Sequence, residues 1–251
     1  MKEGNRSYLR GDYAAAIERY DAALRSVPRL PAAYLDRAYS EEALFRSATD
    51  STERERLATE GVRSFQSYVE TSAAPGARRD SNALDREQVE ERILTLLIDS
   101  QQGDAAIAHL QDRVRSEPRD LAAYELLGQL EAESGRMQPA LQAHRDAIAA
   151  LPDKPEAYYD LGAFVWQLSY RDAGMPAAQR APILDEGISA LTKALELRPD
   201  DPETLVYLNL LDLEKAKCAA NAAERAAFEA QAKTYRDRAL ALRGATATAG
   251  R

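Results

Sequence analysis

The chain has 251 residues, of which 45% are hydrophobic and 29% charged, a globular composition that excludes a collagenous or disordered chain. Its formal net charge of −8 disfavours nucleic acid as a ligand, because the field around the protein repels phosphates. The tightest apolar run, near residues 93–98, is far shorter than the roughly 18 residues of a membrane span, so no transmembrane segment is predicted.

The chain contains an internal repeat. The segment PRLPAAYLD at residues 28–36 recurs as PDKPEAYYD at residues 152–160, and at the same offset Gly11 falls on Gly135. Within each copy, small and apolar residues recur at helical spacing. Gly11 and Gly135 supply the tight turn that separates two antiparallel helices. The repeated unit is therefore predicted to be a helical hairpin.

The clearest copy spans residues 121–154. Its characteristic residues are an early aromatic, a Leu-Gly pair where helices approach closely, two alanines and a closing proline, namely Tyr124, Leu127, Gly128, Ala140, Ala147 and Pro152. This pattern resembles a tetratricopeptide repeat, and related strings occur at residues 11–28, and at 157–162 followed by 187–199. The resemblance implies an all-α fold, a right-handed α-α superhelix (solenoid) of about six helical hairpins, three of them lengthened.

In chain order, the expected hairpins form a single solenoid over residues 1–243 and span about residues 1–30, 31–76, 81–120, 121–154, 155–201 and 202–243. The second, fifth and sixth are the lengthened ones. Asp50 is placed as an N-cap and Pro176 suits a first helical turn, so we expect longer helices instead of loops in the inserts. The inserts are explained either by variation tolerated at a solenoid edge or by contact with a partner. Residues 244–251 are expected to be a disordered tail.

Catalytic chemistry finds little support in the sequence. The histidines, His109 and His144, fall inside second helices and are expected to be packed or partly exposed. The single cysteine, Cys218, lies among alanines and excludes both an internal disulfide and a cysteine-rich zinc site. No glycine-rich phosphate loop is present. We therefore expect no enzymatic activity, no cofactor and no metal site.

The resemblance implies that the first helices of the hairpins line a concave face, which the family typically uses to hold an extended peptide or a partner helix. By spacing from Tyr124, Tyr158 and Leu205, this face is acidic and aromatic. With the matching positions of the amino-terminal half, its candidate residues are Asp36, Tyr39, Glu125, Gln129, Glu156, Tyr159, Asp160, Trp166, Glu203 and Tyr207. Such a groove suits a cationic or arginine-bearing protein or peptide segment.

One alternative to a specific cationic groove remains at this point. The acidic residues could serve only to keep a solvated groove soluble. The carboxylate clamp of some relatives needs lysines and asparagines on this face, but only Asn5 matches and Asp36 stands where the second asparagine belongs. That clamp is not expected here.

The last expected helix, residues 221–243, carries an apolar stripe typical of a terminal capping helix, formed by Phe228, Ala232, Tyr235, Ala239 and Leu242. A second stripe of alanines could allow self-association. The functional prediction is a monomeric protein-protein interaction scaffold. The alternative is a structural assembly component that self-associates through its terminal helix or projecting hairpins.

The compartment is not fixed by the sequence. The residues before Gly4 lack the aromatic turn that Tyr124 supplies in the later copy, which predicts that the natural protein extends upstream, with an export signal or a lipid anchor as candidates. The given chain shows no signal peptide, so a cytoplasmic protein is the default and an exported or lipid-anchored one is the alternative.

Overall fold

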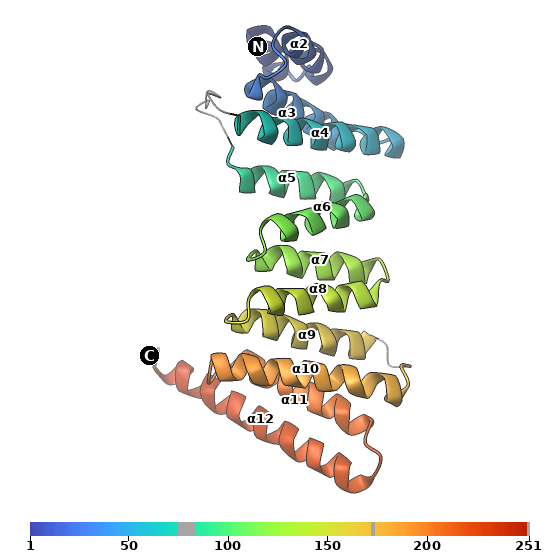
Figure 1. Cartoon of the computed structure of the whole chain (residues 1–251), viewed down its shortest axis with the longest axis vertical. Helices are drawn as coiled ribbons and strands as arrows, with labels where there is room; N and C mark the ends of the chain where they lie inside the picture. The colour runs from blue at the N-terminus through green and yellow to red at the C-terminus, as the bar shows by residue number, and fades with distance from the viewer. Residues whose placement is uncertain (75–83, 172–173, 250–251) are drawn as a thin grey trace. The chain divides into compact units, whose positions relative to one another are not determined.

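The computed structural model describes residues 1–74, 84–171 and 174–249, and all regular structure in these residues is helical (Figure 1). The helices are α1 (Lys2–Leu9), α2 (Tyr13–Ser26), α3 (Pro31–Ser47), α4 (Ser51–Ser72), α5 (Arg86–Asp99), α6 (Gly103–Ser116), α7 (Leu121–Glu133), α8 (Met137–Ala150), α9 (Pro155–Arg171), α10 (Ala177–Leu197), α11 (Pro202–Lys217) and α12 (Ala222–Ala249). The pairs α1–α2, α3–α4, α7–α8, α9–α10 and α11–α12 each pack together as hairpins, so the predicted all-α hairpin fold is confirmed. Among the described residues, no helix is both long and apolar enough to cross a membrane.

The chain divides into two compact units, Met1–His109 and Leu110–Arg251, with the boundary inside α6. In the first unit, each helix from α1 to α5 packs against the next one along the chain. In the second unit, the helices from α7 to α12 do the same, and α9 also contacts α11 directly. First helices of successive hairpins therefore form one layer of the second unit. A single continuous solenoid over residues 1–243 stays a prediction.

The lengthened hairpins are built from longer helices, as predicted. α3 and α4 have 17 and 22 residues, and α9 and α10 have 17 and 21, against 13 and 14 in α7 and α8. Asp50 caps α4, since its carboxylate accepts a hydrogen bond of 2.8 Å from the backbone N–H of Glu53. Pro176 is the N-cap of α10 and thus lies just before the first turn in which the sequence placed it.

The terminal helix differs from the prediction at its end. α12 continues to Ala249, past residue 243, where the sequence predicts the end of the helix and the start of a disordered tail. The segment after Gly244 alternates alanine and threonine, and the high helix propensity of alanine favours this continuation. Ala232 and Ala239 of the predicted apolar stripe are buried, which agrees with the capping role.

Two glycines of the repeat allow helices to approach closely. A Cβ atom at Gly128 would lie 2.7 Å from Nε2 of His144, and one at Gly162 would lie 2.2 Å from Cγ of Leu191. Gly135, in the turn before α8, has a φ of +76°, a conformation that favours glycine. The predicted roles of these glycines in close packing and in a tight turn are confirmed.

Candidate functional site

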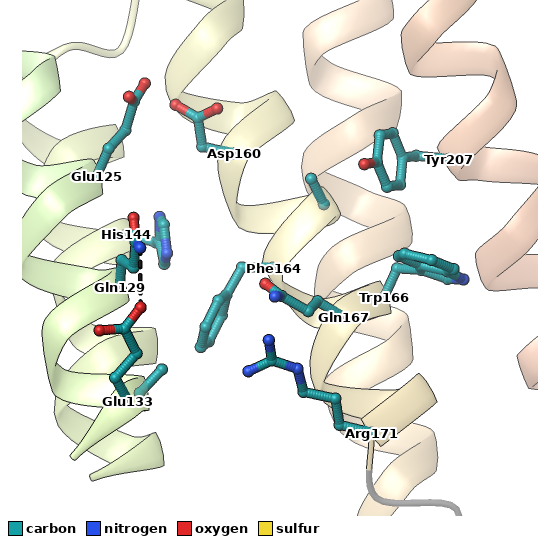
Figure 2. A pocket seen from close by; sticks show the side chains of 12 residues that line it. Glu125, Gln129, Glu133, His144, Asp160, Phe164, Trp166, Gln167, Arg171 and Tyr207 are labelled. Carbon is teal, nitrogen blue, oxygen red and sulfur yellow. Dashed lines mark hydrogen bonds between the residues drawn. The ribbon is translucent and has the colours of Figure 1, made fainter. Parts of the chain in front are cut away.

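A cavity of about 550 Å³ lies in the second unit and is lined by residues of α7, α9 and α11 and by His144 of α8 (Figure 2). Five of the predicted groove residues line it, namely Glu125, Gln129, Asp160, Trp166 and Tyr207. The sequence did not predict the other charged and polar groups of the wall, His144 from α8 and Glu133, Gln167 and Arg171 from the first helices. Glu133 follows Gln129 by four residues, Gln167 follows Asp160 by seven and Arg171 follows Gln167 by four, so helical spacing on α7 and α9 is the signal that could have found the last three.

The register of α7 sets one wall of the cavity. Asp120 caps this helix by accepting a hydrogen bond of 3.1 Å from the N–H of Ala123. With the apolar face turned inward, Glu125, Gln129 and Glu133 follow one another at intervals of four residues on the cavity side. The side-chain amide of Gln129 donates a hydrogen bond of 2.9 Å to Glu133 (Figure 2). This wall is therefore acidic along its length.

The acid end of the cavity is a pair of carboxyl groups. Figure 2 shows Glu125 of α7 and Asp160 of α9 directed toward one another. Burial, a hydrogen bond to Glu125 and the negative charges of Glu125 and Glu156 together raise the pKa of Asp160 to about 8, with burial the largest cause. The raised pKa favours the protonated form of Asp160, which can donate that hydrogen bond to Glu125. Oδ2 of Asp160 is buried and has no hydrogen-bond partner.

His144 forms part of the cavity floor. Its side chain is 6% exposed, and its ring lies against Gly128 and 4.7 Å from the ring of Phe164. Burial lowers the pKa of His144 to about 4, so the ring is neutral at physiological pH. Its Nε2 is buried without a hydrogen-bond partner. The prediction of a packed histidine is confirmed, but the sequence did not predict its place at the cavity.

An aromatic cluster occupies the other side of α9 and the facing part of α11, and consists of Tyr159, Trp166, Tyr170 and Tyr207. Trp166 stacks on Tyr170 at a centroid distance of 5.3 Å and meets Tyr207 edge-on at 5.8 Å. Tyr159 meets Tyr207 edge-on at 5.3 Å. Tyr170 is 68% exposed and is missing from the sequence prediction, although it follows Trp166 by one helical turn. The cluster offers aromatic faces beside the acidic wall.

Two predicted acidic residues are already paired within the chain. Glu156 forms an ion pair with Arg198, and Glu203 forms one of 2.9 Å with Arg243. Neither lines the cavity of Figure 2. Because arginines of the chain offset their charges, these two residues attract a cationic partner less than the sequence alone suggests.

The predicted residues of the amino-terminal half belong to the first unit. Asp36 and Tyr39 line a cavity of about 140 Å³ there, together with Asn5, Tyr8, Leu9 and Tyr20. Tyr39 packs edge-on against Phe65, and the guanidinium of Arg92 lies 4.9 Å from its ring centre. These two residues lie together but in a different unit from the other eight, so their place in the groove stays a prediction.

The remaining candidates for chemistry have structural surroundings. Nε2 of His109 lies 2.6 Å from a carboxylate oxygen of Glu90, and Cys218 is half-buried against the core of the second unit. In the part of the chain that the structure describes, no group of three or more His, Cys, Asp or Glu residues could hold a metal ion.

Comparison with known proteins identifies the fold. No protein-family model matches the chain. The structure is similar to a TPR repeats protein from Bacteroides fragilis NCTC 9343, with a TM-score of 0.54, 15% identity, and coverage of 86% of this chain and 96% of that one. It is also similar to the C-terminal part of a TPR repeat-containing protein from Cytophaga hutchinsonii, with a TM-score of 0.50, 19% identity, and coverage of 96% and 78%. The chain therefore has the tetratricopeptide-repeat fold.

One curated protein is similar in sequence. The cytochrome c-type biogenesis protein CycH of Rhizobium meliloti (strain 1021) is 32% identical over 104 residues, which are 41% of this chain. The match spans 25% of the length of CycH. Most of the length of CycH therefore lies outside the matched region.

Proposed function

We propose that the protein is a protein-protein interaction scaffold whose second unit binds a basic, extended segment of a partner protein. The binding groove is the surface of α7, α9 and α11 that carries the cavity residues Glu125, Gln129, Asp160, Trp166 and Tyr207. The observation that carries the proposal is the meeting of an acidic wall and an aromatic cluster at one cavity of about 550 Å³.

The chemistry of the groove favours a cationic partner. Positive side chains gain Coulomb energy beside Glu125 and Glu133, and they gain cation–π energy over the faces of Trp166 or Tyr207. Trp and Tyr are also the residue types most enriched among the residues that dominate binding energy. The exposed ring of Tyr170 extends this surface beyond the cavity.

The similarity to CycH suggests where to look for the partner. Its name places CycH in cytochrome c biogenesis, and 41% of this chain matches it. Proteins of that process are therefore the first partners to test, and an unbiased capture experiment covers the rest.

The test is quantitative affinity capture from a lysate of the source organism, with the wild-type chain and three variants as baits. Trp166→Ala removes an aromatic anchor and Glu125→Lys reverses one charge of the acidic wall. Glu196→Lys reverses an exposed charge of α10, away from the cavity, and is the matched control. We expect a partner that the first two variants lose and the control retains.

Salt dependence adds a second criterion. A contact between the acidic wall and a basic segment weakens as the ionic strength rises past about 0.15 M, where the screening length falls below about 8 Å. Partners that all three variants retain equally, or that bind as well at high salt, would refute binding in this groove.

A further inference from the structure

At the acid end of the cavity, the raised pKa of Asp160 favours a protonated carboxyl group beside Glu125. Protonated Asp160 donates a hydrogen bond to Glu125, and burial together with the negative charges of Glu125 and Glu156 favours this protonated form. A positive charge placed between the two carboxyl groups would offset the negative charges of Glu125 and Glu156 and favour ionisation of Asp160. The unoccupied site therefore keeps a proton that a bound cation would displace.

Two buried polar atoms at the same cavity lack partners. Neither Oδ2 of Asp160 nor Nε2 of His144 has a hydrogen-bond partner, and the side chain of His144 is 94% buried. Buried polar atoms without partners are uncommon and costly. Both atoms are acceptors when His144 is neutral with its proton on Nδ1. Oδ2 of Asp160 and the carboxylate of Glu125 are therefore acceptors at one end of the cavity, complementary to a group rich in N–H donors, and Nε2 of His144 is a further acceptor beside Gly128 at the cavity floor.

The donor set distinguishes between possible cations. A metal ion does not fit, because among the described residues no cluster of His, Cys, Asp or Glu is arranged to hold one. An ammonium group has three donors and is strongly hydrated, whereas a guanidinium carries five N–H donors in a planar fork that matches carboxylates in a bidentate manner. The guanidinium therefore fits the pair of carboxyl groups best.

We propose that Glu125 and Asp160 form the binding site for one arginine side chain of the partner, and that binding of its guanidinium releases the proton the two carboxyl groups share. In the free protein, the pair is one carboxylic acid and one carboxylate. In the complex, both are carboxylates bridged by the guanidinium, and one proton has passed to solvent. This inference rests on the proposed function, and it assigns the partner residue that sets the register of the bound segment.

Other charged and titratable groups lie around Asp160. They are Glu125 and Glu133 of α7, His144 of α8, Glu156 and Arg171 of α9, Arg198 after α10, and Tyr207 of α11. His144 stays neutral above about pH 4, because burial lowers its pKa to that value. Glu156 is paired with Arg198, which lowers its pKa along with a backbone hydrogen bond. Between pH 6.5 and 9, the change in binding is therefore assigned to Asp160.

The experiment uses a defined probe, the capped peptide Ac-Gly-Arg-Gly-NH2, titrated into the full-length ¹⁵N-labelled chain and followed by NMR. If only ionised Asp160 accepts the guanidinium, a pKa of about 8 makes the apparent affinity about thirtyfold higher at pH 9 than at pH 6.5. At pH 7 in weak buffer, binding should release nearly one proton per peptide. The same peptide with citrulline in place of arginine keeps the shape but not the charge, and should show neither effect.

Variants test whether the pH dependence and the proton release arise from Glu125 and Asp160. Asp160→Asn should abolish both the pH dependence and the proton release, and Glu125→Gln, at an exposed position, should weaken binding at pH 9 without unfolding risk. Glu196→Gln is the control and should behave as the wild type. Circular dichroism verifies that each variant keeps its helix content.

Equal affinity of the arginine peptide at both pH values, equal binding of the citrulline peptide, or an unchanged response in Asp160→Asn would overturn the arginine site. If partner capture still depends on Trp166 in that case, the proposed function stands and only the assignment of the arginine is lost. If capture is also insensitive to Trp166, both are refuted.

Discussion

Substitution of Gly162 tests the helix packing of the second unit most directly. A Cβ atom at this position would lie 2.2, 2.5 and 2.8 Å from Cγ, Cδ2 and Cδ1 of Leu191, whereas ordinary contacts of this kind are 3.4–4 Å. Leu191 is 0% exposed, so it has no free space to rotate into. Because all three of its outer atoms are too close, α9 and α10 would have to move apart.

The magnitude follows from two opposing terms. Overpacking a well-filled core costs about 1–3 kcal/mol, and three contacts below 3 Å place this substitution in the upper part of that range, at about 2–3 kcal/mol. Replacing glycine by alanine inside a helix returns about 1 kcal/mol. We therefore expect Gly162→Ala to lower the free energy of unfolding of the second unit by about 1–2 kcal/mol. For a unit of this size, the melting temperature should fall by about 2–8 °C.

Urea and thermal unfolding followed by circular dichroism are the assays. Gly244→Ala is the control, since no atom lies within 4 Å of its Cβ position, and it should be as stable as the wild type or up to about 1 kcal/mol more stable. The double variant Gly162→Ala/Leu191→Ala lacks the colliding atoms of Leu191. Its loss of stability should therefore be smaller than the sum of the losses in the two single variants, by at least about 0.5 kcal/mol. An unchanged stability of Gly162→Ala, or strict additivity in the cycle, would refute the close approach of these helices.

Three further predictions concern protonation and assembly. The pKa of His144 is about 4 in the folded protein and about 6.5 in the unfolded chain, so the unfolded state binds more protons between these pH values and the protein loses stability on acidification. From pH 7 to pH 5, we expect the free energy of unfolding to fall by about 2 kcal/mol in urea titrations, and His144→Leu should lack this loss. Burial raises the pKa of Glu41 to about 7, despite an Arg37 nitrogen at 2.9 Å, so the stability of the protein falls as the pH rises from about 4.5 to 7. Glu41→Gln lacks this titration, so its stability relative to the wild type should increase by up to about 3 kcal/mol from pH 5 to pH 8. A stability difference that stays constant with pH would contradict this prediction. Sedimentation velocity should give a monomer at all concentrations; a dimer that Leu240→Lys dissociates would instead favour the assembly component, since Leu240 is 60% exposed on α12.

The hairpins were predictable because local patterns determine them. The Leu-Gly pairs, the turn glycines and the cap at Asp50 each act over a few residues, so a repeat in the sequence becomes a repeat in the structure. The groove was predictable only in part. Spacing on α7 and α9 placed Glu125 and Asp160 on the inner face, but it could not show that Arg198 pairs with Glu156, because that contact joins different helices.

The role of His144 shows why the rest of the site could not be derived from the sequence. In helical spacing it is one more core position of α8, and its burial is what the repeat pattern predicts. Only the packing of α8 against Gly128 brings its ring to the floor of the cavity. A side chain at position 128 would push the ring away, so the glycine needed for helix packing also shapes the site.

Stability and the proposed binding in the second unit place opposite demands on the same residues. Asp160 and His144 each leave a buried polar atom without a partner, and burial shifts the pKa of both away from the charged form. For folding alone, apolar residues at these two positions would be at least as favourable, since an unsatisfied buried polar group typically costs about 1–3 kcal/mol. Asp160→Leu is therefore expected to keep or raise the melting temperature while it abolishes arginine-dependent binding. A large loss of stability in this variant would show that Asp160 serves the fold and would remove the energetic argument for a binding role.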